Sequence, residues 1–218
     1  MRRSFTFIII GIFLLVNVIT TDAYAQNKLS AGFNVGTGVS SLHDNGYGAN
    51  KLHIHFGVPL NYKINKNFEI QTTALISSKG YTSSIYKPSE RMSFYYLDLV
   101  TTLKYIPWKI FFIGSGLYTS GLMYSHYKYL AYSYDYYGEP DVSGIVNKFD
   151  YGLNGSFGCQ YENGIGFEVS ILYGLRDVFN SHISDTLDGY YGAPHIIPAE
   201  ANGNNVVIST SFYYLFGY

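Results

Sequence analysis

Seven charged residues in this sequence lie in extended segments, at positions where strand alternation would point their side chains to the same face of a sheet. Most have apolar or aromatic residues on both sides, which alternation along a strand places on the opposite face. Because buried charges are tolerated when they are paired, we expect a salt-bridged and hydrogen-bonded interior rather than a reactive site. The members of this predicted interior charge network are Lys51, Glu69, Asp98, Lys104, Asp150, Glu168 and Arg176.

Two histidines, His53 and His55, share the inward face of the same segment. A His-x-His pair on a strand suits metal binding or proton-linked chemistry, but a metal site needs further ligands, and the sequence places no third one. The chain also lacks a phosphate-binding glycine loop, a nucleophile elbow and zinc-ligand spacing. We therefore predict no metal and no cofactor.

A second group of reactive residue types follows later, where His182 and Ser184 are joined by Asp185 and Asp188. A Ser, His and acid set performs nucleophilic acyl chemistry when the three side chains meet in space. The stretch is rich in Gly, Asp and Ser, and turn formation accounts for those types without catalysis. We predict a protein without catalytic residues and keep this group as an alternative.

Tyrosines crowd the region around residues 124–137. Rigid aromatic side chains form contact surfaces at low entropic cost, which would suit ligand binding. We favour the interpretation that they extend a strand beyond a membrane and form an interfacial girdle. The tyrosines concerned are Tyr124, Tyr127, Tyr129, Tyr132, Tyr134, Tyr136 and Tyr137.

The last thirteen residues indicate which elements position these groups. From Val206 to Tyr218, every second side chain is apolar, aromatic or threonine. One face would meet lipid and the other a barrel interior, which is typical of the closing strand of an outer-membrane β-barrel. We predict that the outward aromatic residues form the signal recognised by the barrel assembly machinery. They are Phe212, Tyr214, Phe216 and Tyr218.

Seven further alternating segments precede this strand, separated by connections that are long and short in turn. An even number of such strands predicts an all-β, antiparallel, up-and-down transmembrane barrel with short periplasmic turns and long outer loops. Closure is required because an open sheet edge in lipid leaves backbone groups unpaired. The eight predicted strands are 28–39, 51–62, 68–78, 92–105, 110–124, 148–161, 165–177 and 206–218.

The start of the chain has the features of a secretory signal. Arg2 and Arg3 precede an apolar run, and an Ala-x-Ala site ends at Ala25. The run is shorter than a stable transmembrane helix. We predict a cleaved signal peptide over 1–25 and a mature barrel over 26–218.

Composition supports export to a membrane. The chain is 47% hydrophobic and 18% aromatic but only 13% charged, about half the usual charged fraction. Cys159 is the single cysteine, so no intramolecular disulfide can form. A formal net charge of −1 gives no indication of nucleic-acid binding.

Four motifs, in order, resemble the PorT-like outer-membrane β-barrel family. They are Tyr96-Leu-Asp-Leu-Val-Thr-Thr-Leu-Lys-Tyr105, Phe112-Ile-Gly-Ser-Gly-Leu-Tyr118, Phe149-Asp-Tyr-Gly152 and Val169-Ser-Ile-Leu-Tyr-Gly-Leu175. The resemblance spans essentially the whole mature chain. It implies an eight-stranded barrel in the outer membrane of a Gram-negative-type envelope and a link to protein secretion.

Together these features predict a small, non-enzymatic barrel with a structural or accessory role in secretion or surface assembly, exerted through its outer loops or its periplasmic turns. Its expected partners are outer-membrane lipid and lipopolysaccharide, the barrel assembly machinery, and a secretion-system or surface protein. One alternative is a lipid-modifying enzyme such as a lipid A deacylase acting through His182 and Ser184. The other is a narrow channel, although eight strands leave little free lumen.

Overall fold

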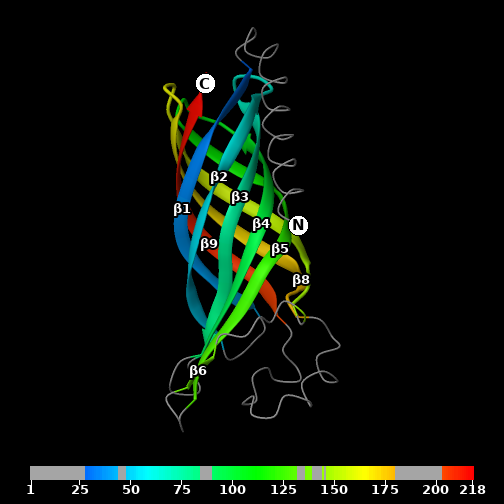
Figure 1. Ribbon diagram of the computed structural model, residues 1–218. Helices are drawn as coiled ribbons and strands as arrows, with labels where there is room; N and C mark the ends of the chain where they lie inside the picture. The colour runs from blue at the N-terminus through cyan, green and yellow to red at the C-terminus, as the bar shows by residue number, and fades with distance from the viewer. Residues whose placement is uncertain are drawn as a thin grey trace, which may run out of the picture.

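The computed structural model is a closed antiparallel β-barrel (Figure 1). It describes residues 28–43, 48–83, 90–131, 136–138, 144, 146–179 and 203–218. The predicted signal peptide, 1–25, lies outside the described residues. Within the described residues, no helix has the length and apolar character needed to cross a membrane.

The described residues contain nine strands. Their bounds are β1 Leu29–His43, β2 Gly48–Lys63, β3 Phe68–Ser83, β4 Glu90–Tyr105, β5 Phe111–Ala131, β6 Tyr136–Gly138, β7 Phe149–Gln160, β8 Ile165–Asp177 and β9 Asn204–Phe216.

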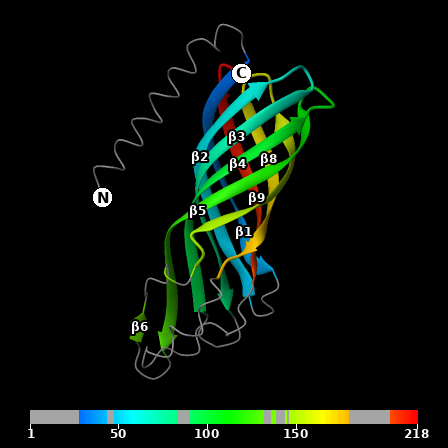
Figure 2. The same cartoon turned by 90° about the vertical axis from the view of Figure 1, so that its right-hand side faces the viewer.

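Eight of the strands form the barrel in the order β4-β3-β2-β1-β9-β8-β7-β5, and β5 pairs with β4 to close it. β6 pairs only with the last residues of β5, Tyr129 to Ala131. The two form a ribbon that extends past the barrel wall (Figure 2). The predicted eight-stranded antiparallel barrel is therefore confirmed.

Alternating burial follows the alternating sequence along each barrel strand. On β2, Leu52, Ile54 and Phe56 are exposed on the outer wall, whereas His53 and His55 are buried inside. Outward apolar side chains and inward polar ones are what a strand between lipid and a barrel lumen requires. The hydrophobic pattern thus fixes which face of each strand is the outer wall.

Several strands run further than the apolar pattern does. β1 continues to His43, β3 to Ser83 and β5 to Ala131. Cross-strand backbone pairing, which does not depend on side-chain hydropathy, carries these extensions. On β5 the register shifts so that Tyr95 pairs with Tyr124 and Tyr96 with Leu122, which leaves Met123 as an extra bulged residue.

The short turns, 64–67, 106–110 and 161–164, lie at the barrel end that also holds the C-terminus (Figure 1). Asn65 stabilises the first turn because its Oδ1 accepts hydrogen bonds from the backbone N–H groups of Asn67 and Phe68. Gly164 ends the third turn with φ +87°, a conformation glycine adopts without strain. The other four connections join strand ends at the opposite end, which is the outer end in barrels of this kind. The connection between β1 and β2, predicted to be long, is only four residues, because both strands extend beyond their predicted bounds.

Apolar side chains fill the interior near the outer end. One cluster joins inward residues of β1, β3 and β4 to residues beside the long connections, and Val146 and Phe179 form an isolated bridge there. Its members are Leu42, Tyr81, Met92, Phe94, Tyr96, Val146, Val178 and Phe179. A second cluster crosses the middle of the barrel and contains Leu75, Val100, Tyr118, Leu172 and Val207.

Candidate functional site

One cluster of charges inside the barrel is centred on Lys79 of β3, which is fully buried. Its Nζ lies 3.1 Å from Asp98 Oδ1 and 4.0 Å from Asp150 Oδ2, and it donates to Ser120 Oγ at 3.0 Å. Asp98 Oδ2 accepts a further hydrogen bond from Ser77 Oγ at 2.7 Å. The Lys79 ammonium therefore forms ion pairs with two buried carboxylates, those of Asp98 and Asp150.

Asp150 completes this cluster from β7. Its Oδ2 accepts hydrogen bonds from Tyr118 Oη at 3.1 Å and from Asn205 Nδ2 at 2.8 Å. The Lys79 ammonium lies 4.8 Å from the ring centroids of both Tyr96 and Tyr118, a cation–π distance. Four strands of the barrel are thereby tied together around one ammonium group.

A second cluster lies nearer the periplasmic end, around Lys104 of β4, which is also fully buried. Its Nζ lies 3.2 Å from Glu168 Oε2 of β8, on the far side of the lumen. It also donates to Gln71 Oε1 at 2.8 Å and Tyr213 Oη at 3.2 Å, and lies 3.9 Å from the Phe112 ring centroid. The contact between Lys104 and Glu168 is therefore a buried ion pair that crosses the lumen.

Glu69 is held by neutral donors. Its Oε2 accepts hydrogen bonds from Asn61 Nδ2 at 2.9 Å and Gln160 Nε2 at 3.2 Å, and its Oε1 accepts one from Tyr218 Oη at 2.7 Å. Lys51, near the outer end, directs its ammonium to Ser78 Oγ and Lys79 O. Six of the seven predicted network members are thus buried inside the barrel, but they form separate clusters rather than one network.

Arg176 does not belong to the interior, and its predicted inward position is corrected here. Its side chain is exposed and donates to Phe149 O at 3.3 Å and Asn147 Oδ1 at 3.2 Å. The register between β8 and β9 shifts between Tyr173 and Asp177. Strict alternation therefore fails just before Arg176. The buried cation that sequence reasoning missed is Lys79, which lay beyond the predicted end of its strand.

The two histidines form a hydrogen-bonded chain. His53 Nδ1 lies 2.9 Å from Ser78 O, His53 Nε2 lies 2.9 Å from His55 Nδ1, and His55 Nε2 lies 3.0 Å from Ser211 Oγ. Because a carbonyl oxygen only accepts, His53 donates through Nδ1. With both rings neutral, His53 Nε2 then accepts from His55, and His55 Nε2 accepts from Ser211. All four ring nitrogens are occupied by these contacts.

Metal ligands do not gather in the described part of the barrel, where no group of three or more His, Cys, Asp or Glu side chains is placed to hold an ion. The space between the interior clusters is a cavity of about 30 Å³, lined among others by His55, Asp98, Asn154 and Glu168. Such a space admits one or two water molecules. The described interior is filled largely by side chains, which are polar in the charged clusters and apolar in the two clusters described above.

The closing strand β9 places Phe212 and Phe216 on the exposed outer wall. Tyr214 packs beside Phe216, with ring centroids 5.0 Å apart. The predicted outward position of Tyr218 is wrong, because Gly217 has φ +70° and reverses the chain after Phe216. Tyr218 instead turns back to donate to Glu69, and Lys63 Nζ lies 3.4 Å from its ring centroid. Burial and the nearby Glu69 carboxylate raise the pKa of Tyr218, so its phenol remains a donor.

His182, Ser184, Asp185 and Asp188 lie outside the described residues, as do the side chains of most of the crowded tyrosines. Tyr124 is described and is exposed on the outer wall. Ser93 faces His126 across the β4–β5 ladder. His126 Nδ1 has no hydrogen-bond partner among the described residues.

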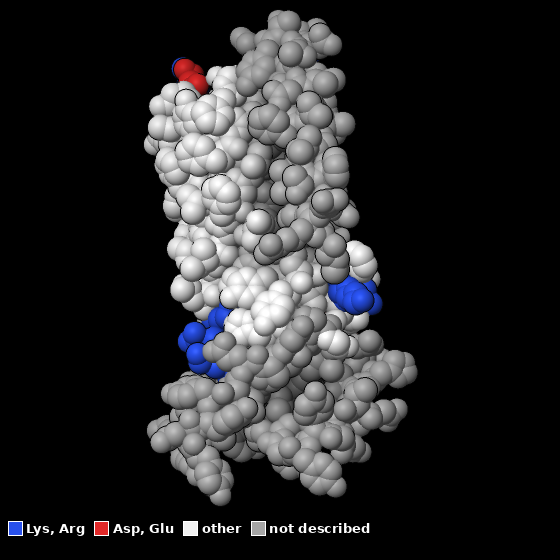
Figure 3. Space-filling model, in the orientation of Figure 1, with Lys and Arg blue, Asp and Glu red and all other residues white. Residues whose placement is uncertain are grey.

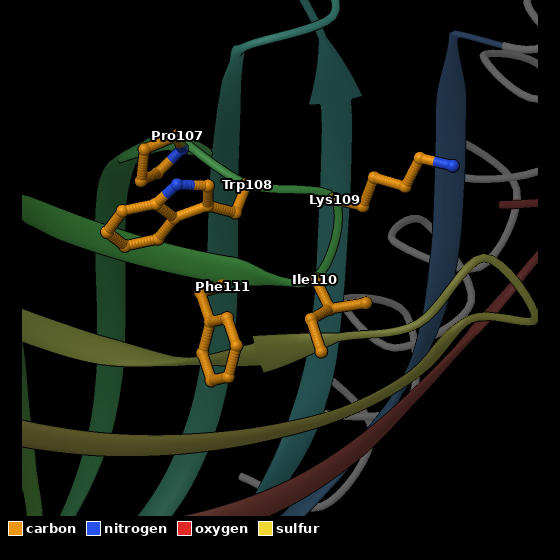
Figure 4. A pocket seen from close by; sticks show the side chains of 5 residues that line it. All are labelled: Pro107, Trp108, Lys109, Ile110 and Phe111. Atoms are coloured by element: carbon orange, nitrogen blue, oxygen red, sulfur yellow. The ribbon is translucent and has the colours of Figure 1, made fainter.

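A hollow of about 710 Å³ lies on the outside of the periplasmic turn between β4 and β5, lined by residues 107–111 (Figure 4). Trp108 and Phe111 are exposed there, Trp108 to 69%. Aromatic side chains are enriched where a membrane meets water. The exposed Trp108 and Phe111 would suit a position at the periplasmic membrane boundary.

Comparison with solved structures gives distant likenesses. Ail of Yersinia pestis, solved with the heparin analogue sucrose octasulfate, has 10% identity and a TM-score of 0.42, with 86% of this chain and 99% of that chain covered. Neisserial surface protein A has 10% identity and a TM-score of 0.46, with 84% and 96% covered. OprG of Pseudomonas aeruginosa has 12% identity and a TM-score of 0.41, with 86% and 97% covered.

No curated protein matches the chain in sequence. The model of one protein family does match, over residues 24–180, and that family is described as the outer membrane protein beta-barrel domain. The match covers most of the chain and agrees with the closed barrel and its apolar outer wall. The predicted outer-membrane location is confirmed, and the chain belongs to the outer membrane protein beta-barrel domain family.

Proposed function

We propose that this protein is a non-conducting, non-enzymatic outer-membrane barrel that anchors a binding surface formed by its outer connections and its β5–β6 ribbon. The observation that carries the proposal is the packed interior, where a cavity lined by residues of seven of the eight barrel strands measures about 30 Å³. A solute pathway would require a continuous hydrated lumen. With the lumen filled, the surfaces left for function are the outer wall and the two ends.

The interior clusters support an anchoring role because they make the barrel rigid. Lys79 and Lys104 link strands that are far apart around the barrel, and removal of either partner of a buried ion pair is strongly destabilising. A rigid scaffold suits a protein whose loops carry recognition. The ribbon begins where β5 leaves the barrel wall, so its base is fixed by that scaffold (Figure 2).

The partner we propose is a protein of a secretion or surface-assembly system, as the PorT-like resemblance of the strand motifs implies. The apolar outer wall would contact membrane lipid, including lipopolysaccharide in the outer leaflet. The outward aromatic residues of β9 would be read by the barrel assembly machinery.

Cross-linking in intact outer membrane, followed by affinity capture, tests this proposal. One variant replaces residues 129–138 with an Asn-Gly turn, which removes the ribbon and leaves the barrel strands in place. The control is Trp108→Ala, which alters an exposed side chain on the turn at the opposite end of the barrel and leaves the proposed binding surface unchanged. We expect a cross-linked protein with the unaltered chain and the control, and its loss from the ribbon variant. Absence of any cross-linked protein above background would contradict the proposal.

A further inference from the structure

A distinct surface lies on the outer wall where β4 and β5 approach the outer end of the barrel. The bulge at Met123 shifts the register, so that three pairs of side chains beyond it share the outward face. In order toward the outer end, these pairs are Tyr95 with Tyr124, Ser93 with His126, and Arg91 with Lys128. We call these six residues the β4–β5 face.

Three rings of the β4–β5 face are stacked. The Tyr95 and Tyr124 centroids are 6.3 Å apart with an interplanar angle of 27°, and Tyr95 and His126 are 5.8 Å apart at 20°. His126 and Tyr124 are 5.7 Å apart at 30°. The result is a compact group of three nearly parallel rings on the barrel wall, of which Tyr124 is the most exposed. Tyrosine, with its apolar ring and polar hydroxyl, suits the boundary between hydrocarbon and headgroups.

Positive charge lies immediately beyond the rings. Arg91 and Lys128 are exposed and face each other across the ladder, an arrangement that is unfavourable for like charges unless an anion screens them. Buried Lys51 also interacts electrostatically with Arg91. Among the side chains that the structure describes on β3, β4 and β5, no Asp or Glu faces outward. Lys128 also interacts with another group within the protein, so we assign the main contact with an anion to the exposed Arg91.

The order of residues along β4 matches the layers of a membrane. Toward the outer end, the exposed Leu99 and Leu97 of the apolar wall are followed by Tyr95, and Arg91 lies four positions beyond Tyr95 in that direction. Four residues span about 13 Å along a strand, or about 9 Å of depth at a 45° tilt. Figure 3 shows two separate groups of Lys and Arg side chains toward this end of the barrel, and the part of the wall drawn in white above them is uncharged. Arg91 therefore reaches the headgroup level when the leucines lie in hydrocarbon.

We propose that the β4–β5 face binds a phosphorylated glycolipid of the outer leaflet, the lipid A part of lipopolysaccharide. A phosphate would accept hydrogen bonds from the Arg91 guanidinium, whose planar fork matches phosphate oxygens, and Lys128 would add a second positive charge. The sugar would lie on the Tyr95, Tyr124 and His126 rings, and the acyl chains would follow the apolar wall. This site does not depend on the protein partner proposed above.

Native mass spectrometry of the purified barrel, titrated with bisphosphorylated lipid A, tests the site. Arg91→Gln should weaken binding about tenfold, because a hydrogen bond to a charged group is lost. Lys109→Gln is the matched control, since it removes one exposed cation at the opposite end of the barrel. The affinity of the control for bisphosphorylated lipid A should be within about twofold of that of the unaltered chain. The unaltered chain should bind phosphate-free lipid A about tenfold more weakly than bisphosphorylated lipid A.

Three results would overturn the proposal. The first is equal affinity of the unaltered chain and Arg91→Gln for bisphosphorylated lipid A. The second is equal affinity of the unaltered chain for bisphosphorylated and phosphate-free lipid A. The third is full displacement of lipid A by equimolar inorganic pyrophosphate. The third would identify an anion site that does not select a lipid. Heat-modifiable migration on gels establishes that each variant is folded. If Arg91→Gln does not fold, Arg91→Lys replaces it, and retention of full affinity by Arg91→Lys would exclude recognition by the guanidinium fork.

Discussion

Replacing Lys104 with methionine should destabilise the barrel strongly. Lys104 is fully buried, and its ammonium lies 3.2 Å from the carboxylate of Glu168 across the lumen. Methionine fills similar space but leaves that carboxylate without its cation. It also removes the donor to Gln71 Oε1. The effect should therefore exceed that of losing a single surface ion pair.

The expected cost of Lys104→Met is about 3–5 kcal/mol, the range for stranding one charge of a buried pair. Glu168→Gln should cost a similar amount, because it strands the lysine. The double variant leaves no unpaired charge, although Gln71 Oε1 still lacks a donor, which costs about 1–3 kcal/mol. The double variant should therefore be at least about 2 kcal/mol more stable than the sum of the two single effects predicts.

Urea unfolding in lipid vesicles, with both single variants and the double, provides the measurement. Lys109→Met serves as the control, because Lys109 is exposed on a periplasmic turn and its loss should change the free energy of unfolding by less than about 0.5 kcal/mol. If both single variants prove as stable as the control, the charges are hydrated rather than buried. The barrel would then contain a water-filled path, and the narrow-channel alternative would take precedence.

Three other expectations can be checked independently. Tyr218→Phe removes the donor to Glu69 and should lower the free energy of unfolding by about 1–3 kcal/mol in the same urea assay; no change would show that the C-terminal residue does not close the periplasmic end. Phe212→Lys places a charge on the lipid-facing wall, where a lysine costs up to about 2–4 kcal/mol at the bilayer midplane. It should reduce the fraction of the protein that shows heat-modifiable migration when made in cells, whereas Phe212→Leu should not. His182→Ala and Ser184→Ala should leave the acylation of lipid A unchanged in its mass spectrum; a shift tied to either residue would establish the deacylase alternative.

The barrel architecture could be predicted from sequence because it follows from local alternation. Strand β4 shows this, because its outer and inner faces can be assigned without knowledge of any neighbouring strand. The outer face carries Leu97, Leu99 and Leu103, and the inner face carries Asp98 and Lys104. Once eight such segments alternate with long and short connections, an antiparallel barrel is the arrangement that leaves no edge in lipid. The fold class therefore depends on local information.

The partners of the interior charges could not be predicted in the same way. Lys104 and Glu168 come from β4 and β8, which are not neighbours in the barrel, so their contact depends on strand order and stagger. Lys79 was missed because β3 continues by backbone pairing after its apolar alternation ends. Tyr218 was misplaced because one positive φ at Gly217 reverses the chain. Each of these errors arose where long-range geometry or a single backbone conformation overrides alternation.

Electrical recording in planar lipid bilayers tests the packed interior most directly. The purified barrel, inserted at a known orientation and shown to be folded by heat-modifiable migration, is exposed to a potential difference in concentrated salt. With a cavity of about 30 Å³ inside, we expect no stepwise current above that of the protein-free bilayer. Reproducible unitary conductance steps from the unaltered protein would contradict the packed interior and the anchoring function inferred from it.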